Sequence, residues 1–465
     1  MGLFNVLATD VAVSLYGQTF DVSLNWIGNL IKGLITGVGS VGVGIILFSV
    51  ILRFIVLPFD VFQRITMRKQ NIKMKENQAK MEKLQKQYAN NKDLYNQKVM
   101  EIYKESGFSI FSSCLPMILS LVIFIVAINA FNAYSQYSNI ENYNTMVRAY
   151  NAKMESYCPD LDAATTTVTL EGDKLYVRDS ADGKYLYYTV ANKDGYDNAY
   201  IAGAEKSYFV NADEALKNEQ IQNYVKAAAE ANTSETMSFE EKEAAALKGY
   251  FMERAQEAVV VAYNDVVVPH TSFLWIKNIW VTDAAYKHPI LEHSEFQTEV
   301  SREKFLVGGK EVSLNELPTT VYGADAYNDI TRKLDKAKGQ ANGYFILILL
   351  SIGTILLQQF VSMHSQKEQQ KYSSVDGQGA SQQKMMMIMM TGMFAIFSFM
   401  YSSAFSIYMI MSNVLSMIST LIINKIVDTV EGKKEEKALQ EKYNKRFPGR
   451  NLQNGKDGKA DKKGK

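Results

Sequence analysis

Residues 385–424 read MMMIMMTGMFAIFSFMYSSAFSIYMIMSNVLSMISTLIIN, a run of 40 residues without Asp, Glu, Lys or Arg. As one α-helix this run would be about 60 Å long, which is twice the thickness of the hydrocarbon core of a bilayer. It must therefore fold back on itself, and residues 401–403 (YSS) are the expected turn. We expect one membrane-spanning helix over residues 385–401 and a second over residues 404–426.

Three further segments are long and apolar enough to cross a membrane. They cover residues 41–61, 108–133 and 343–363, and the first contains Arg53. The chain as a whole has a net charge of +1 and 47% hydrophobic residues, averages that a soluble protein would also have, but its charges are unevenly distributed. This pattern excludes a wholly soluble enzyme and a disordered chain, and two Cys are too few for a disulfide scaffold.

The charges between the spans predict an orientation, because loops on the cytoplasmic side of a membrane are enriched in Lys and Arg. Residues 60–107 contain 11 Lys and Arg against 6 Asp and Glu, and residues 425–465 contain 13 against 7. Residues 134–342 contain 21 against 32. We therefore expect the N-terminus and residues 134–342 outside, and three segments in the cytoplasm: a hairpin (62–107), a loop (364–384) and the tail (427–465).

The first 40 residues form an extracytoplasmic N-terminal segment in this scheme. Residues 25–36 (NWIGNLIKGLIT) place apolar side chains at helical spacing, which predicts an amphipathic helix. Such a helix either lies in the membrane interface or packs against the membrane helices, and the sequence leaves both open.

The hairpin 62–107 begins and ends at the membrane, and residues 89–91 (ANN) are its expected turn. Apolar residues at helical spacing on both sides of the turn predict two paired amphipathic helices with Lys and Arg outward. The hairpin is either a solvated connection or a contact surface for a client or a partner. The candidate contact residues are Arg64, Arg68, Lys69, Lys83 and Lys86.

The tail is basic and poor in apolar residues, so we expect it to be disordered. Its positive charge suits anionic lipid or ribosomal RNA, and equally a solubilising tail that helps to fix the topology.

Several short motifs resemble the YidC-type membrane protein insertases, the bacterial members of the YidC/Oxa/Alb family. The order and spacing of these motifs carry the resemblance. They are IILFSVILRFIVLP (45–58), IYKESG (102–107), SSCLPMILSLVIF (112–124), SFLWIKNIWVTD (272–283), Leu357-Gln358-Gln359, and Ile407-Tyr408 with Ser412-Asn413.

The chain also departs from the family pattern. Phe108-Ser109-Ile110 replaces the Asn-Pro that usually precedes the second span, the usual Pro of the hairpin is missing, and Met409 stands where a Trp is common. The outer connection is enlarged by two insertions, residues 134–269 and 284–340, which contain no motif that identifies them. Within them we expect a helix at 140–154, β-strands at 165–191, and helices at 213–265 and 326–338.

The resemblance implies an all-α polytopic protein of the bacterial cell membrane. It would have five transmembrane helices and a cytoplasmic helical hairpin, with an inserted mixed α/β extracytoplasmic domain (134–342). It also implies a membrane protein insertase and chaperone that is not an enzyme and needs no cofactor or metal ion. Such a protein acts alone or with the Sec translocon. Its hydrophilic intramembrane groove contains a positively charged Arg and releases clients laterally into lipid. The candidate groove residues are Arg53, Gln358, Gln359, Ser412 and Asn413.

The partners implied are nascent membrane proteins and membrane lipid, with the ribosome, anionic lipid and the Sec translocon as candidates, and no DNA. From the residues alone, Arg53 either faces a wet groove or extends to the inner headgroups. The polar residues of the other spans that could line such a groove are Ser112, Ser113, Ser120, Gln358, Gln359, Thr391, Ser398, Ser412 and Asn413. Two other functional classes also stay open: a transporter or channel with Arg53 in its pathway, and a membrane-anchored receptor or enzyme whose chemistry lies in the insertions. The sequence contains no GxxxxGK[ST], HExxH or GxSxG motif.

Overall fold

The structure is a computed structural model, and it describes most of the chain. The described residues are 11–16, 19–105, 110–157, 166–171, 174–179, 185–189, 205–210, 212–317, 321–365 and 378–446. They form two compact units. We call the first the α/β unit (Met1–Gly44, Asn129–Ile346 and Tyr401–Ala404) and the second the bundle unit (Ile45–Ile128, Leu347–Met400 and Phe405–Lys465).

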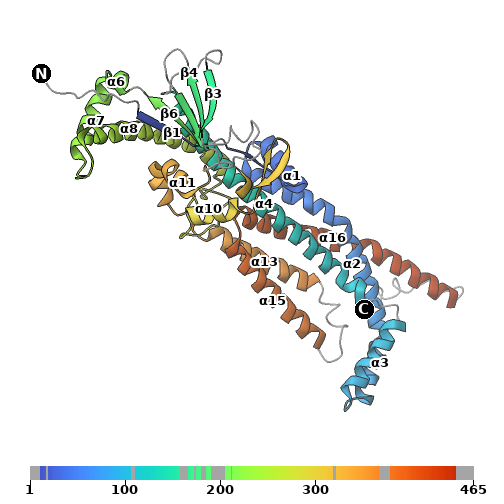
Figure 1. Ribbon diagram of the computed structural model, residues 1–465. Helices are drawn as coiled ribbons and strands as arrows, with labels where there is room; N and C mark the ends of the chain where they lie inside the picture. Colours follow the sequence, from blue (N-terminus) through green and yellow to red (C-terminus); the bar gives the residue numbers. More distant parts are fainter. Residues whose placement is uncertain are drawn as a thin grey trace, which may run out of the picture. The chain divides into compact units, whose positions relative to one another are not determined.

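The bundle unit consists largely of long helices. In their apolar runs each helix satisfies its own backbone hydrogen bonds, as a chain in lipid must. Figure 1 labels these helices. They are α2 (Val41–Gln87), α3 (Lys92–Glu105), α4 (Ile110–Glu155), α13 (Ile346–Ser365), α15 (Gln378–Met400) and α16 (Ser403–Arg446). The break between α15 and α16 lies at residues 401–402, within the turn expected from the sequence. Helix α16 continues to Arg446, so residues 427–446 of the tail are helical and the prediction of disorder is wrong for them.

The break between α2 and α3 lies at residues 88–91, and Asn91 caps α3 by accepting a hydrogen bond from the backbone N–H of Leu94 (3.1 Å). A side-chain oxygen at this position satisfies one of the free N–H groups at the start of a helix. Helices therefore lie on both sides of residues 88–91, while the paired cytoplasmic hairpin expected over residues 62–107 stays a prediction.

Four described helical segments are long and apolar enough to cross a membrane: Val41–Lys69, Leu121–Glu155, Ile346–Ser365 and Ser403–Arg446. In α15 the apolar segment found is shorter, Thr391–Met400. The structure thus supports a multi-pass membrane protein, while the count of five spans stays a prediction that depends on α15.

Large apolar side chains lie on the outside of the bundle unit. Phe54, Leu349 and Met389 are 68%, 66% and 69% exposed. In water this surface would be unfavourable, whereas hydrocarbon accepts it without cost. Aromatic pairs fill the inside: Phe48 of α2 lies 6.5 Å from Tyr408 of α16, and Phe124 of α4 lies 4.6 Å from Phe394 of α15 (distances between ring centroids).

The α/β unit contains two antiparallel sheets (Figure 1). The first has the strand order β1-β6-β5-β4-β3, and the second has the order β2-β7-β8. The strands are β1 (Val11–Leu15), β2 (Asp21–Val22), β3 (Thr166–Glu171), β4 (Lys174–Asp179), β5 (Tyr185–Thr189), β6 (Glu205–Val210), β7 (Lys304–Val307) and β8 (Lys310–Ser313). The strands expected at residues 165–191 are therefore present.

The N-terminal strands belong to these sheets. Val11 of β1 pairs with Val210 of β6, and Asp21 of β2 pairs with Leu306 of β7. From the sequence we expect residues 1–40 to form a separate N-terminal segment. In the structure, residues 11–15 and 21–22 are instead hydrogen-bonded to strands of the 134–342 region.

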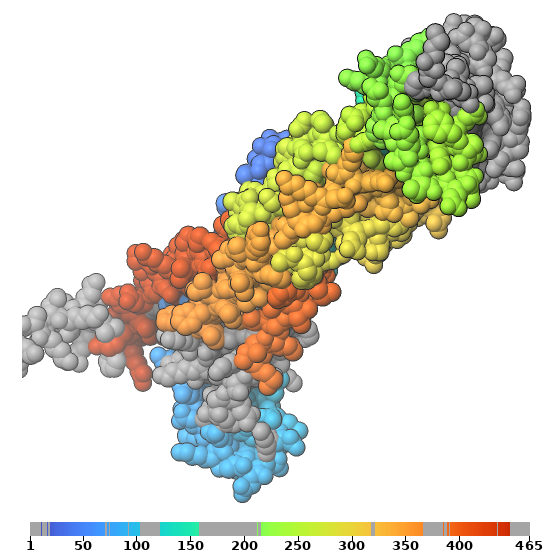
Figure 2. All heavy atoms as spheres, turned by 90° about the vertical axis from the view of Figure 1, so that its left-hand side faces the viewer, coloured from blue at the N-terminus to red at the C-terminus, as the bar shows by residue number. Residues whose placement is uncertain are grey.

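Helices complete the α/β unit. They are α1 (Trp26–Val38), α6 (Ala212–Ala215), α7 (Glu219–Ala231), α8 (Phe239–Ala262), the π-helix η1 (Tyr263–Val267), α9 (Val268–Thr271), α10 (His293–Val300), the 3-10 helix η2 (Leu314–Glu316), α11 (Ala324–Ile330), the 3-10 helix η3 (Arg332–Leu334) and α12 (Asp335–Lys338). A capping box of Ser238 and Glu241 starts α8. Helix α8 packs against α11 and η3, and Figure 2 shows these yellow-green and orange segments on one face.

The second half of α4 supplies the centre of this unit. Tyr143 and Tyr150 are fully buried, and the Tyr143 hydroxyl donates to the carbonyl of Val321 (2.7 Å). Tyr143 also stacks on Tyr327 of α11 at 5.1 Å between ring centroids. The sequence predicts a span at 108–133 and a separate helix at 140–154, whereas the structure has one continuous helix over both.

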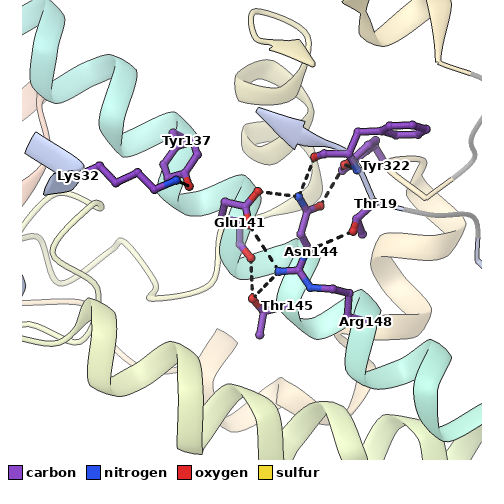
Figure 3. Close-up of polar contacts among 9 residues, drawn as sticks. Thr19, Lys32, Tyr137, Glu141, Asn144, Thr145, Arg148 and Tyr322 are labelled. Carbon is purple, nitrogen blue, oxygen red and sulfur yellow. Dashed lines mark hydrogen bonds and ion pairs between the residues drawn. The ribbon is translucent and has the colours of Figure 1, made fainter. Parts of the chain in front are cut away.

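A buried polar network joins α4 to the N-terminal segment (Figure 3). The Asn144 amide donates to the carbonyl of Phe20 (3.1 Å) and to Glu141 (3.2 Å), and its oxygen accepts from the Tyr322 hydroxyl (3.0 Å). Tyr322 in turn accepts from the backbone N–H of Phe20 (3.2 Å). Buried polar groups are stable only when they are hydrogen-bonded. The network therefore fixes the positions of α4, the N-terminal segment at Phe20 and the segment at Tyr322 relative to one another.

Helix α1 buries one face and leaves another apolar face outside. Ile31 and Ile35 are buried, whereas Trp26 is 76% exposed and Leu30 is 42% exposed. Lys32 donates to the hydroxyl of Tyr137 on α4 (2.5 Å) (Figure 3). The helix therefore packs against its own unit, and its outward face still has the apolar character that an interfacial helix needs.

Candidate functional site

Arg53 of α2 lies within the bundle unit among polar partners. Its Nε donates to the hydroxyl of Ser419 on α16 (3.1 Å), and its Nη2 forms a hydrogen-bonded ion pair with Asp60. The side chains of Arg53 and Asp60 are 14% and 25% exposed. The arginine is therefore neither free in solvent nor surrounded only by apolar groups.

The helix geometry explains the ion pair. Arg53 and Asp60 are seven residues apart, which is two helical turns or about 10.5 Å along the axis. They share one face of α2, and a helical side chain leans towards the N-terminus, so Asp60 leans towards Arg53. Pro58 lies between them and has no N–H to donate to the carbonyl of Phe54, so the helix is locally weakened at this point.

Polar side chains of α16 continue this face towards α13. Asn413 donates to the hydroxyl of Thr354 (3.4 Å), and Gln358 donates to the hydroxyl of Ser416 (3.5 Å). Asn413, Ser416 and Ser419 follow one another at spacings of three residues, so they lie along one side of α16. Both donor–acceptor distances exceed the usual range of about 2.7–3.2 Å, so these hydrogen bonds are weak.

A second pair of polar contacts joins α13 to α15. Gln359 accepts a hydrogen bond from Thr391 (2.7 Å), and the hydroxyls of Ser351 and Ser398 lie 2.9 Å apart. Figure 1 shows these two helices side by side in orange. Polar groups on α2, α13, α15 and α16 therefore meet inside a unit whose outside is apolar. We call this set of residues the polar stripe: Arg53, Asp60, Ser351, Thr354, Gln358, Gln359, Thr391, Ser398, Ser412, Asn413, Ser416 and Ser419.

Every residue proposed for the groove whose side chain the structure describes is in the polar stripe. Arg53, Gln358, Gln359 and Asn413 make the contacts given above, and Ser412 is hydrogen-bonded to the side chain of Tyr408. The second span contributes three further predicted groove residues, Ser112, Ser113 and Ser120. Their side chains lie outside the described part of the structure.

Sequence reasoning misses five members of the polar stripe: Asp60, Ser351, Thr354, Ser416 and Ser419. Asp60 was counted with the charges of the hairpin that follows the first span. Ser416 and Ser419 could have been found, because they repeat at helical spacing after Ser412 and Asn413. The contact between Thr354 and Asn413 could not be found from the sequence, because the two residues lie on different helices.

Two of the basic residues proposed as contact residues are engaged within the protein. Asp428 of α16 accepts from Arg68 (2.7 Å) and from Arg64 (3.5 Å), and Arg64 also donates to the carbonyl of Ser365 (3.1 Å). Asn424 donates to the hydroxyl of Ser365 (2.7 Å). These contacts tie α2, α13 and α16 together, so Arg64 and Arg68 have structural partners in this state.

The other three proposed contact residues, Lys69, Lys83 and Lys86, are exposed along α2. Their charged groups are thus accessible. The described residues contain no group of three or more His, Cys, Asp or Glu side chains that could hold a metal ion.

Comparison with known proteins gives one family. The family model described as "60Kd inner membrane protein" matches residues 33–169 and 217–431. The unmatched residues between them, 170–216, contain β4, β5 and β6.

Curated proteins called "Membrane protein insertase YidC" are similar over shorter stretches. The protein of Caldanaerobacter subterraneus is 38% identical over 98 residues, which are 21% of this chain and 46% of that protein. The protein of Fusobacterium nucleatum is 35% identical over 86 residues, 18% of this chain and 40% of its own length. The Enterococcus faecalis protein is 37% identical over 90 residues, 18% of this chain and 31% of its own. The chain spans less than half the length of these relatives, and no solved structure matches it.

Proposed function

Because the chain belongs to the 60Kd inner membrane protein family, we propose that it is a membrane protein insertase that inserts integral membrane proteins into the bacterial cell membrane and helps them to fold. The name shared by the similar curated proteins supports this proposal. The single observation that carries it is the half-buried Arg53 at the end of a polar stripe inside an apolar bundle. A charge in a membrane span is costly and is retained for function.

In this proposal the protein has five spans, and α15 is the fourth of them. The N-terminus and the α/β unit are outside, while α3, the second half of α2 and the basic tail are in the cytoplasm. The charge distribution between the spans supports this orientation. The 16 uncharged residues from Met385 to Met400 support α15 as a span, and with it the count of five.

The polar stripe would act as a groove that shortens the dry path across the bilayer. An unfolded polar segment loses its hydrogen bonds to water when it enters hydrocarbon. Hydroxyl and amide groups of Ser416, Gln358 and Asn413 would replace part of that water. Arg53 would bind carboxylates or carbonyls of the client, since a guanidinium offers five donors in a fixed plane.

The driving force would be the transfer of the client's apolar segment into lipid. Exposed side chains of the bundle, such as Phe54, Leu349 and Met389, would give that segment a surface along which to leave the groove. Each buried CH₂ contributes about 0.8 kcal/mol, so a span of 20 residues supplies far more than the cost of moving a short polar tail. No covalent step is needed, and in this proposal the protein is not an enzyme.

The proposed partners are nascent membrane proteins and membrane lipid. The ribosome, anionic lipid and the Sec translocon are further candidates, the first two through the basic tail. On α2, the exposed Lys69, Lys83 and Lys86 are better candidates for contacts with a client or a partner than Arg64 and Arg68. The two arginines already pair with Asp428.

The test uses the purified full-length chain in lipid vesicles and a one-span client with a short tail containing two Asp residues. Insertion is measured as protection of the tail from added protease. We expect the wild-type chain to increase protection over empty vesicles and Arg53→Ala to lose most of that gain. A charge-assisted hydrogen bond contributes about 1.5–3 kcal/mol, which corresponds to about tenfold or more.

Two control variants make the result specific. Arg53→Lys retains the charge and should retain part of the activity, and Lys98→Ala removes an exposed charge of α3 and should change nothing. If the wild-type chain protects no more than empty vesicles, the proposed function is wrong. If Arg53→Ala equals the wild type, the role of the arginine is wrong.

A further inference from the structure

The cation of the polar stripe has a negative partner on its own helix. Asp60 forms its ion pair with Arg53, and among the described residues it has no other partner. The pair is within α2 and does not connect two helices. The contact that ties this side chain to α16 is the separate hydrogen bond from Arg53 to Ser419.

The two charges sum to zero, and this changes what a client would meet. A client carboxylate does not approach a bare guanidinium, because Asp60 already accepts from Nη2 and Ser419 accepts from Nε. Nη1 has no hydrogen-bond partner among the described residues, so a client can bind this nitrogen without displacing a resident group. Two-point binding of a client carboxylate also uses Nη2. The like charge of Asp60 at that nitrogen repels a second carboxylate, so tight binding favours the departure of Asp60.

We propose that Asp60 is a resident counter-ion that competes with client carboxylates for Arg53 and so limits how long acidic client segments are held in the groove. This inference rests on the proposed function. An intramolecular competitor is always present at high effective concentration, so it lowers the affinity for an acidic segment without any other change in the site. It also shields the half-buried guanidinium when no client is bound, and an unpaired charge there would be unfavourable.

The competition has a specific consequence for client choice. An acidic segment must displace Asp60, whereas a neutral polar segment can use Nη1 and the hydroxyls of the stripe without displacing it. Asp60 therefore narrows the difference in affinity between acidic and neutral segments. Removing its charge should widen that difference in favour of acidic segments.

The experiment compares two clients that differ only in the tail, one with two Asp residues and one with two Asn residues. Each has a photo-activated cross-linker beside the variable positions, and the full-length chain is in lipid vesicles. The measured quantity is the ratio of cross-linking of the acidic tail to that of the neutral tail. We expect Asp60→Asn to raise this ratio about tenfold over the wild type, with release of the acidic client slowed correspondingly.

The controls are Glu436→Gln, which removes an exposed carboxylate of α16 outside the polar stripe, and Asp60→Glu, which retains the charge. Both should keep the wild-type ratio. Asp60→Thr is a second neutral variant, and it should raise the ratio as Asp60→Asn does. An unchanged or lowered ratio in the folded neutral variants overturns the proposal.

Failure to fold is also decisive. If neither neutral variant gives the cooperative melting of the wild-type chain, the carboxylate is a structural requirement and the proposal is wrong. The outcome is separable from that of the proposed function. A wild-type chain that inserts neither client contradicts the insertase itself, whereas active insertion with no effect of Asp60→Asn contradicts the counter-ion alone.

Discussion

The carboxyl group of Glu299 should make the α/β unit less stable as the pH rises. Glu299 is on α10, and both of its oxygens accept from the Asn139 amide of α4 (3.0 and 3.3 Å). Burial raises its pKa from the ordinary value of 4.5 to about 7, the Asn139 hydrogen bond opposes this, and Glu295 and Glu303 raise the pKa further while Arg302 lowers it. The folded protein therefore keeps a proton that the unfolded chain releases.

The sign and size follow from the two pKa values. Between pH 4.5 and pH 7 the folded state binds more protons than the unfolded state, so the free energy of unfolding falls as the pH rises through this range. The difference between the two pKa values corresponds to a loss of about 3 kcal/mol in the free energy of unfolding. This is an upper limit, because the side chain is partly accessible to solvent. The loss is complete above about pH 8, and the full stability is present below the unfolded pKa.

The assay is a urea series with a short protease pulse on the full-length chain in detergent micelles, at pH 5 and at pH 8. We expect Glu299→Gln to be more stable than the wild type at pH 8 and to depend less on pH. Burial also raises the pKa of Glu303, so part of the slope should persist in the variant. Glu230→Gln on α7 is the control and should keep the wild-type slope. If Glu299→Gln keeps that slope too, the reasoning is refuted.

Two further substitutions test the fold. Asn144→Ala removes the buried amide at the centre of the network in Figure 3 and leaves its partners unsatisfied; the urea midpoint should fall by an amount corresponding to about 2–4 kcal/mol, and a loss below about 0.5 kcal/mol would contradict the assigned role. Gly343→Ala places a Cβ against the Asp283 carboxylate, whereas the Cβ of Gly353→Ala meets open space. Melting temperatures should fall for the first and stay level or rise for the second, and equal effects would count against the packing seen at Gly343.

The membrane helices could be predicted because hydrocarbon excludes charge, so the uncharged runs mark them directly. The continuity of α4 could not be predicted in the same way. The rule of span length ends the helix at residue 133, but no Gly or Pro follows before Ile140, and the helix continues to Glu155. Beyond the apolar run its tyrosines bind the core of the α/β unit instead of lipid.

The strands of the α/β unit show the difference between local and distant pairing. Residues 165–191 alternate and contain turn signals, so their hairpins are visible in the sequence. Strand β1 has no such signal, because its partner β6 lies far along the chain. The five residues of β1 can therefore be recognised as a strand only when their pairing with β6 is known.

The polar stripe was partly visible. Arg53, Gln358, Gln359 and Asn413 are conspicuous as polar residues in apolar runs. Asp60 was not, since a carboxylate seven residues after Arg53 can belong either to the span or to the hairpin that follows. The choice depends on which way two side chains lean along one helix, and this is information that the spacing alone does not contain.

The most direct test of the account asks whether the polar stripe is wet. The starting chain carries Cys114→Ser and Cys158→Ser, which remove both native cysteines. One variant then adds Ser416→Cys in the polar stripe. The other adds Ile418→Cys on the apolar surface of the same helix, at nearly the same depth. A charged maleimide that cannot cross membranes is added to the chain in lipid vesicles. We predict labelling at position 416 and none at position 418, although Ile418 is 48% exposed in the structure, because its surroundings are lipid. Labelling at position 418 with none at position 416 would contradict a hydrated groove.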